Sequence, residues 1–362
     1  AMGLISWLTE PIREVHRLAP TEVEAGRFSM SRRPAAEIDE STFETLEQQR
    51  LAALRHRTRS FIVGVPVVIL LSAITYGLCA QFGVDSGDTI IWSIVALVFG
   101  GLIVRFAANA GIWIFRKTAK HRVLSVLAAQ QGLQYQMEGV EDEILQPFKD
   151  QDLFGLDTNS GDSEDVFSGK IEGVDFVLFE ARRLKVTKSD NSTSKTLAFH
   201  GLCLRLSFPK RFSGTTRVLS DFGLLNKLHE VGNDVKLERV RLEDRTFEKH
   251  FEVVSSDQVE ARYLLTPALM ERLMEAQRIL GKRTRLRAGF HDRYMLLTLD
   301  TRKNRSFGSR VRGGPLNELH HFEIENPNKP VEQSAVVRRF EQEIAVCKDI
   351  VKTLELNMKT RI

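Results

Sequence analysis

Residues 61–82 read FIVGVPVVILLSAITYGLCAQF, and residues 90–103 read IIWSIVALVFGGLI. The first run carries no formal charge over a length that is about what a helix needs to cross a bilayer. A short link separates the two runs, so they are predicted to form a transmembrane helical hairpin with crossings at about residues 61–82 and 89–110. A buried hairpin in a soluble protein is the alternative, but it would need neither this length nor charged flanks.

The charges around the two apolar runs predict their orientation. The link at 83–89 contains Asp85 and Asp88 but no lysine or arginine, whereas basic residues flank the other ends of both runs: Arg55, Arg57, Arg59, Arg116, Lys117, Lys120 and Arg122. Because lysine and arginine in short loops stay on the cytoplasmic side, both termini are expected in the cytoplasm. A multi-pass topology is therefore expected.

Two polar residues and a row of small residues mark the second apolar run. Arg105 and Asn109 are one turn apart. A charge at membrane depth suggests a functional role, as in a transport or channel subunit, but Arg105 can instead snorkel to the cytoplasmic phosphates. Small residues recur on the same helix, at Ala96, Gly100, Ala107 and Gly111. Such spacing allows close helix approach, either within the hairpin or in a homo-oligomer.

The remaining sequence predicts an α+β protein. Its parts are a cytoplasmic N-terminal segment and helix (1–59), the hairpin (60–115), a connecting helix (116–132), a soluble domain (133–330) and a C-terminal amphipathic helix (331–362). Strands are predicted at 166–171, 174–187, 196–208, 235–242, 250–254, 285–291 and 294–299, with a polar loop at 188–195. Because the strands follow each other closely, an antiparallel sheet with helices on one face is expected.

The C-terminal helix shows the clearest periodicity outside the hairpin. Its apolar residues are spaced alternately three and four apart: Val337, Phe340, Ile344, Cys347, Val351 and Leu354. This spacing predicts either an amphipathic helix that packs on its own domain or a short coiled-coil seam between copies of the chain. The docked helix is favoured, because so few heptads are marginal for an independent coiled coil.

Motifs of familiar catalytic or metal chemistry do not occur in the sequence. It lacks GxSxG, HExxH, GxxxxGK(S/T) and GxGxxG, and its three cysteines share no CxxC spacing. The acidic run 157–165 fails the EF-hand register and is read as a surface loop, with a cation-binding loop as the alternative. No enzymatic activity, cofactor or metal is therefore expected. Perturbed protonation of Glu260, Arg262 or the 157–165 carboxylates would revive an enzyme hypothesis.

Charge is balanced overall but concentrated in one segment. The 362 residues contain 51 basic and 47 acidic residues. Segment 282–312 holds ten basic residues against Asp292 and Asp300, and its candidate contacts with anionic lipid or an acidic partner are Arg302, Lys303, Arg305, Arg310 and Arg312. Solvation or internal pairing is the alternative. Nucleic acid is disfavoured, because only Phe307 is interleaved in the loop for base stacking.

A stretch in the second half of the chain is distinctive: FEKHFEVVSSDQVEARYLLTPALMERL at 247–273, preceded by FHGL at 199–202 and FPKRFSGTT at 208–216. It resembles the signature of a bacterial membrane family of unknown function, over about residues 45–325. The resemblance implies a bacterial inner-membrane protein with two crossings followed by a soluble region, and it assigns no catalytic residues. Within the stretch, Glu260 and Arg262 are expected to pair with neighbouring residues, with a functional Glu260–Arg262 site as the alternative, and Thr266-Pro267 suits the start of a helix.

The sequence thus favours a membrane-anchored cytoplasmic binding or scaffold module without recognisable catalytic chemistry. The expected partners are the lipid bilayer and a protein of unknown identity. A homo-oligomer is expected, if at all, through the small-residue face or the C-terminal helix. The alternatives are an oligomeric transport or channel subunit that uses Arg105 and Asn109, and an enzyme with an unrecognised site.

Overall fold

The computed structural model describes residues 40–155, 158–189, 192–220, 237–280, 285–300, 322, 324, 326–331 and 334–360. The chain divides into two compact units. The first comprises residues 1–126 with 323–337, and the second comprises 127–322 with 338–362. Two long apolar helices, a nine-stranded antiparallel sheet and a C-terminal helix make the fold α+β, as predicted.

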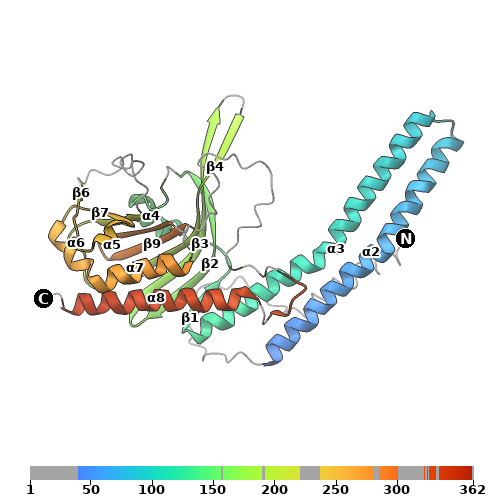
Figure 1. The fold of residues 1–362 in the computed structure, drawn as a ribbon. Helices are drawn as coiled ribbons and strands as arrows, with labels where there is room; N and C mark the ends of the chain where they lie inside the picture. The colour runs from blue at the N-terminus through green and yellow to red at the C-terminus, as the bar shows by residue number, and fades with distance from the viewer. Residues whose placement is uncertain are drawn as a thin grey trace. The chain divides into compact units, whose positions relative to one another are not determined.

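The first unit is built on two helices, α2 (Glu40–Gln81) and α3 (Ser86–Gln130) (Figure 1). Both are long and apolar enough to cross a membrane. At a rise of about 1.5 Å per residue, each is roughly 60 Å long, about twice the thickness of a bilayer's hydrocarbon core. Since α3 continues without interruption to Gln130, the connecting helix predicted at 116–132 is not a separate element.

Close packing joins α2 to α3. A Cβ atom placed on Gly64 would lie 2.7 Å from a methyl group of Val104, and one placed on Gly100 would lie 2.7 Å from a methyl group of Val68. The two glycines therefore make room for valines of the opposite helix. Gly111 likewise faces α2. The small-residue face thus packs within the hairpin at Gly100 and Gly111, and an oligomer through this face stays a prediction.

The second unit contains one antiparallel sheet with the strand order β1-β2-β3-β4-β9-β8-β5-β7-β6. The strands are β1 (Leu133–Gln136), β2 (Ser160–Ile171), β3 (Val174–Ser189), β4 (Ser192–Ser207), β5 (Thr216–Ser220), β6 (Glu238–Arg239), β7 (Phe251–Ser255), β8 (Arg285–His291) and β9 (Tyr294–Asp300). The β2–β3 hairpin turns at Glu172 and Gly173, as predicted. Both have positive φ, 49° and 83°, as a tight two-residue hairpin turn requires.

Helices cover both faces of the sheet, so the prediction of helices on one face is wrong. The helices are α4 (Asp142–Asp150), α5 (Arg245–Glu248), α6 (Gln258–Leu264), α7 (Pro267–Leu280) and α8 (Ala335–Thr360). Phe148 of α4 packs on Phe179 of β3, whereas Phe340 of α8 packs on Phe167, the partner of Leu178. Because successive strand residues point to opposite faces, α4 and α8 lie on opposite sides.

The C-terminal helix packs on its own domain, as the favoured interpretation expected. Its apolar residues Phe340, Ile344, Cys347, Val351 and Leu354 are all buried. Lys348 Nζ also donates a hydrogen bond to Oε1 of Gln131, over 2.5 Å. The apolar seam of α8 is therefore covered within a single chain.

Three predictions about strands need correction. The polar segment 188–195 is not a loop, because the β3–β4 ladder continues to the pair of Ser189 and Ser192, held by main-chain pairing rather than by apolar side chains. The strand expected at 235–242 is limited to β6 within the described part of the chain. The acidic run 157–165, expected as a loop, belongs to β2 from Ser160 onward, and Asp157 lies outside the described residues.

The buried thiols of the second unit give a testable consequence of this packing. Burial raises the pKa of Cys203 and of Cys347 above the usual value of 9.0. Both are therefore expected to resist maleimide in the native protein and to react on denaturation. Above about pH 9 only the unfolded thiols would ionise, so stability should fall as pH rises. Pulsed labelling read by mass spectrometry checks this, and fast native labelling of Cys203 would contradict it.

Candidate functional site

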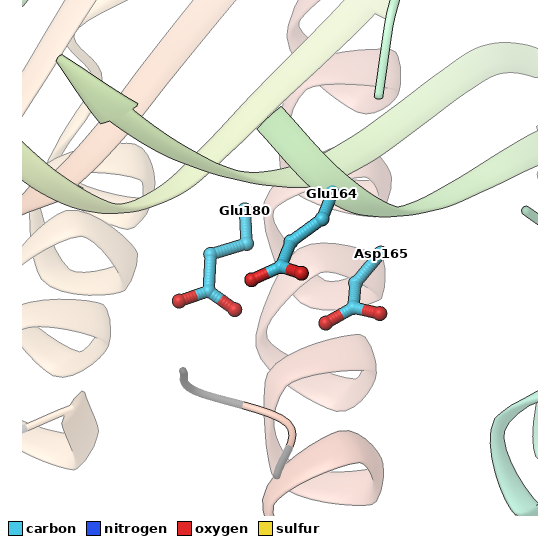
Figure 2. Close-up of side chains that lie close together, drawn as sticks. All are labelled: Glu164, Asp165 and Glu180. Carbon is cyan, nitrogen blue, oxygen red and sulfur yellow. The ribbon is translucent and has the colours of Figure 1, made fainter. Parts of the chain in front are cut away.

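The most polar part of the sheet interior is a buried cluster on the face that α8 covers. It is formed by Tyr135 of β1, Glu164 and Asp165 of β2, Glu180 of β3 and His200 of β4. Figure 2 shows the three carboxylates side by side, all pointing to the same side of the sheet. Asp165, Glu180 and His200 are almost completely buried. We call these five residues the carboxylate cluster.

A β-bulge brings the two acidic residues of β2 together. Regular strand alternation would send Glu164 and Asp165 to opposite faces. The β2–β3 register shifts between Glu164 and Phe167, and Asp165 has a φ of 54°, in the left-handed region. This irregularity turns Asp165 toward the same face of the sheet as Glu164. Glu180, the cross-strand partner of Glu164, lies on that face as well.

Hydrogen bonds link the cluster across the strands. Nε2 of His200 lies 3.1 Å from Oε1 of Glu180. The hydroxyl group of Tyr135 donates to Oδ1 of Asp165 over 2.7 Å. One carboxylate oxygen from each of Glu164, Asp165 and Glu180 lies within 4.8 Å of the other two. The cluster thus consists of two bonded pairs, His200 with Glu180 and Tyr135 with Asp165, whose carboxylates lie close to each other and to Glu164.

The cluster has the donor types of a metal or proton site. Carboxylate oxygens are the ligands that hard divalent cations prefer, and imidazole extends the set toward transition metals. Three oxygens this close together can also share protons. Buried networks of this kind equally serve to fix strand register, which demands that every member be satisfied. The geometry allows each of these roles.

Sequence reasoning found only part of this cluster. It singled out the acidic run 157–165, which includes Glu164 and Asp165, but it did not connect the run with Tyr135, Glu180 or His200. Those residues come from other strands, and only the pairing register brings them together. One signal was available: Glu180 interrupts the apolar face that Phe176 and Leu178 begin.

Glu260, from the distinctive stretch, lies on α6 and binds the segment that precedes β5. Its side chain is buried, and its carboxylate accepts hydrogen bonds from the backbone N–H groups of Ser213 (2.8 Å) and Gly214 (2.6 Å). Asp257 caps the same helix, α6, because its Oδ1 accepts from the N–H groups of Val259 and Glu260. Glu260 therefore has a structural role, joining α6 to the segment before β5.

Arg262, from the same stretch, lies on the protein surface. It is exposed, and its guanidinium donates to the carbonyl and side-chain oxygens of Gln258 on the same helix. Thr266-Pro267 starts a helix, as predicted: α7 begins at Pro267, and Thr266 Oγ1 lies 3.4 Å from the N–H donor of Leu269. Within the described chain, Glu260 and Arg262 thus bond different neighbours, and a functional site that uses both residues stays a prediction.

Arg105 and Asn109 lie on the outer surface of α3. Both side chains are exposed, and Nδ2 of Asn109 donates to the carbonyl oxygen of Arg105 over 2.7 Å. The amide of Asn109 is thus already bonded within its own helix. Neither residue faces the packed interior of the hairpin. Their proposed role in transport therefore needs partners from outside the described chain.

The five basic residues named as lipid or partner contacts, Arg302, Lys303, Arg305, Arg310 and Arg312, lie outside the described residues. Of their basic neighbours within the described chain, Arg287 is used internally. Its Nη1 donates to the carbonyl oxygen of Leu153 over 3.3 Å. Internal pairing therefore accounts for at least one of the ten positive charges counted in segment 282–312.

Comparison with known proteins adds a family of unknown function. The model of a family described as "Protein of unknown function (DUF3137)" matches residues 197–356, from β4 to α8. This match is consistent with the resemblance to an uncharacterised family, and it includes most of α8 but not the hairpin. No curated protein matches the chain.

Among solved structures, the chain is similar to one described as the crystal structure of the mycobacterial trehalose monomycolate transport factor A, TtfA. That protein is 13% identical to this chain, with a TM-score of 0.32. The alignment covers 63% of this chain and 96% of that one.

Proposed function

We propose that this chain is a membrane-anchored scaffold module. In this proposal α2 and α3 cross the inner membrane and hold the α+β domain at its cytoplasmic face, where the domain binds a protein partner. The match to a domain of unknown function neither adds nor removes a catalytic role.

The observation that carries the proposal is the apolar outer surface of the hairpin. Large apolar side chains between residues 61 and 106 are exposed, up to 82% for Phe82 and 80% for Phe106. Nearer the other ends of the helices, apolar residues such as Leu46, Phe115 and Leu124 are buried. A continuous exposed apolar surface is costly in water, at about 25 cal/mol per Å². Lipid chains would remove that cost.

Residues at the end of the apolar surface support an inner-leaflet boundary there. Trp113 is 63% exposed, and Nζ of Lys117 lies 5.8 Å from the centre of its ring. Amphipathic aromatic residues and lysines gather at the level of lipid headgroups. Arg105, exposed about two turns before Trp113, is within reach of the same headgroups by snorkelling. The positive residues beside this boundary support a cytoplasmic placement of the domain.

The test is proteolysis from each side of the membrane. Trypsin added to right-side-out spheroplasts is expected to leave the full-length chain intact. Added to inverted vesicles, it is expected to remove the sheet domain and leave a hairpin fragment that stays with the lipid. Digestion of the domain from outside intact cells, or recovery of the full chain in solution without detergent, would contradict the proposal. A periplasmic marker protein controls for leakage.

A transport or channel subunit is the second candidate, and its motivating observation is the exposed polar pair on α3. Since Arg105 and Asn109 lie on the outer surface, such a subunit would bring copies of α3 together around them. Substitution of Arg105 by leucine would then abolish activity without unfolding the chain. An unaltered phenotype of that variant would leave the anchoring function as the better account.

A further inference from the structure

β3 and β4 continue beyond the sheet as a two-stranded ribbon (Figure 1). The ladder of β2 with β3 ends at the pair of Ser160 and Leu184, and the ladder of β4 with β9 ends at the pair of Gly201 and Asp300. Past Leu184, the only strand paired with β3 in the described chain is β4, although the side chain of Asn159 still bonds the backbone of Val186. We call residues 185–189 and 192–196 the β-arm.

The β-arm is exposed and positively charged. Residues 187–189 and 192–195 are all exposed, and the described residues of the arm include three lysines and no acidic residue, whereas Asp190, between its two strands, lies outside the described residues. Val186 pairs with Lys195, and Lys188 pairs with Thr193, so both lysines project from the same face of the ribbon. Neither forms an ion pair within the described chain. A two-stranded ribbon is marginal in water by itself, and two like charges on one face add repulsion.

An exposed acidic surface lies at the start of α4 in the same unit. Four carboxylates occur within six residues, all of them exposed: Glu138, Glu141, Asp142 and Glu143. A lysine is near them, Lys149, whose Nζ lies 3.7 Å from Oδ1 of Asp142. That aspartate is still 92% exposed. We call these four carboxylates the acidic patch.

We propose that the β-arm of one chain docks on the acidic patch of a second copy. The charges are complementary, and each copy supplies both an arm and a patch. Two reciprocal contacts would close a two-fold dimer, whereas one contact per copy would extend a chain of subunits. Charged rim contacts give specificity and salt dependence more than raw affinity. Anchoring in a shared membrane raises the effective concentration, a contribution that rests on the proposed function.

A charge-swap experiment on the full chain in mild detergent tests the interface. The arm variant carries Lys188→Glu and Lys195→Glu, and the patch variant carries Glu138→Lys and Glu141→Lys. Each is expected to raise the dissociation constant for self-association by about tenfold or more, because like charges then face each other. The chain with all four substitutions, and an equimolar mixture of the two variants, are expected to recover association. Mass photometry at low and high salt gives the readout.

The controls distinguish a lost interface from a folding defect and from a loss of membrane anchoring. A matched variant with Lys249→Glu and Arg293→Glu reverses two exposed charges elsewhere and should associate like the wild type. Protection of the Cys203 thiol reports that each variant is folded. A monomeric wild-type chain at all concentrations, or failure of the four-substitution chain to associate, overturns the proposal. The proposal is also overturned if the arm variant associates like the wild type but no longer binds anionic vesicles, because that result would assign the β-arm to lipid binding. Because detergent replaces the membrane, these outcomes do not depend on topology.

Discussion

Replacing Glu260 by alanine is expected to lower the free energy of unfolding of the sheet domain by about 3 kcal/mol. The change leaves the N–H groups of Ser213 and Gly214 without their acceptor in a region where the glutamate itself is buried. Ser213 is exposed and Gly214 half-buried, so water reaches these donors in part, and the loss is that of two hydrogen bonds to a charged acceptor, at about 1.5 kcal/mol each. The measurement is denaturant-dependent protection of the buried Cys203 and Cys347 thiols in a Cys79→Ser background.

Two further variants sharpen this prediction. Glu260→Gln keeps the shape of the side chain but offers only one oxygen to two donors, so it is expected to cost about 2 kcal/mol. Arg262→Ala is the matched control in the same helix. Because Arg262 is exposed and donates to Gln258 on its own helix, its loss should stay within about 0.5 kcal/mol. If Arg262→Ala lowers the free energy of unfolding as much as Glu260→Ala does, the result would favour a site that uses both Glu260 and Arg262.

His200→Ala is expected to be comparably destabilising, by about 3 kcal/mol. The side chains of His200 and Glu180 are only 5% and 2% exposed, and the imidazole lies 3.1 Å from the carboxylate. Removing one member of a buried polar pair leaves the other with less compensation and also opens a cavity. The same thiol-protection measurement applies, because Cys203 lies on the same strand as His200.

A double-mutant cycle isolates the interaction. Glu180→Ala, His200→Ala and the double variant are expected to show a coupling free energy of about 1 kcal/mol or more. The control is the ion pair of Arg182 on β3 and Asp162 on β2, whose aspartate is 59% exposed. Asp162→Ala is expected to cost about 0–1 kcal/mol, because solvent screens that pair. A coupling near zero between Glu180 and His200 would mean that the cluster is not an interacting network.

Periodic segments of the chain were predictable from sequence. The apolar runs predicted the hairpin helices, Thr266-Pro267 predicted the start of α7, and the strands predicted at 285–291 and 294–299 match β8 and β9. The strand residues 188–189 and 192–195 were not predictable, since these polar and small residues form strands only because they are paired across a ladder already begun. The sequence also did not predict that helices cover both faces of the sheet, because α4 is short and contains Pro147.

The carboxylate cluster shows the same division. Glu164 and Asp165 were recognised as part of an acidic run. They lie on the same face of the sheet only because of a β-bulge, which the local sequence does not predict. Their meeting with Glu180 depends on the β2–β3 register, and the meeting of Glu180 with His200 on the β3–β4 register. Glu260 was expected to pair with neighbouring residues, but the sequence could not show that its partners include the backbone N–H groups of Ser213 and Gly214, which are distant in the chain.

The sequence by itself determined the hairpin helices, the α+β class and the amphipathic character of α8. These features follow from hydrophobic length and periodicity, which are local properties of a chain in water or lipid. Only the tertiary structure decided which acidic side chains share a face, what Glu260 holds, and that β3 and β4 extend past their sheet. Those properties depend on cross-strand register and on contacts between residues distant in sequence, and a shift of one residue in register would send each side chain to the opposite face.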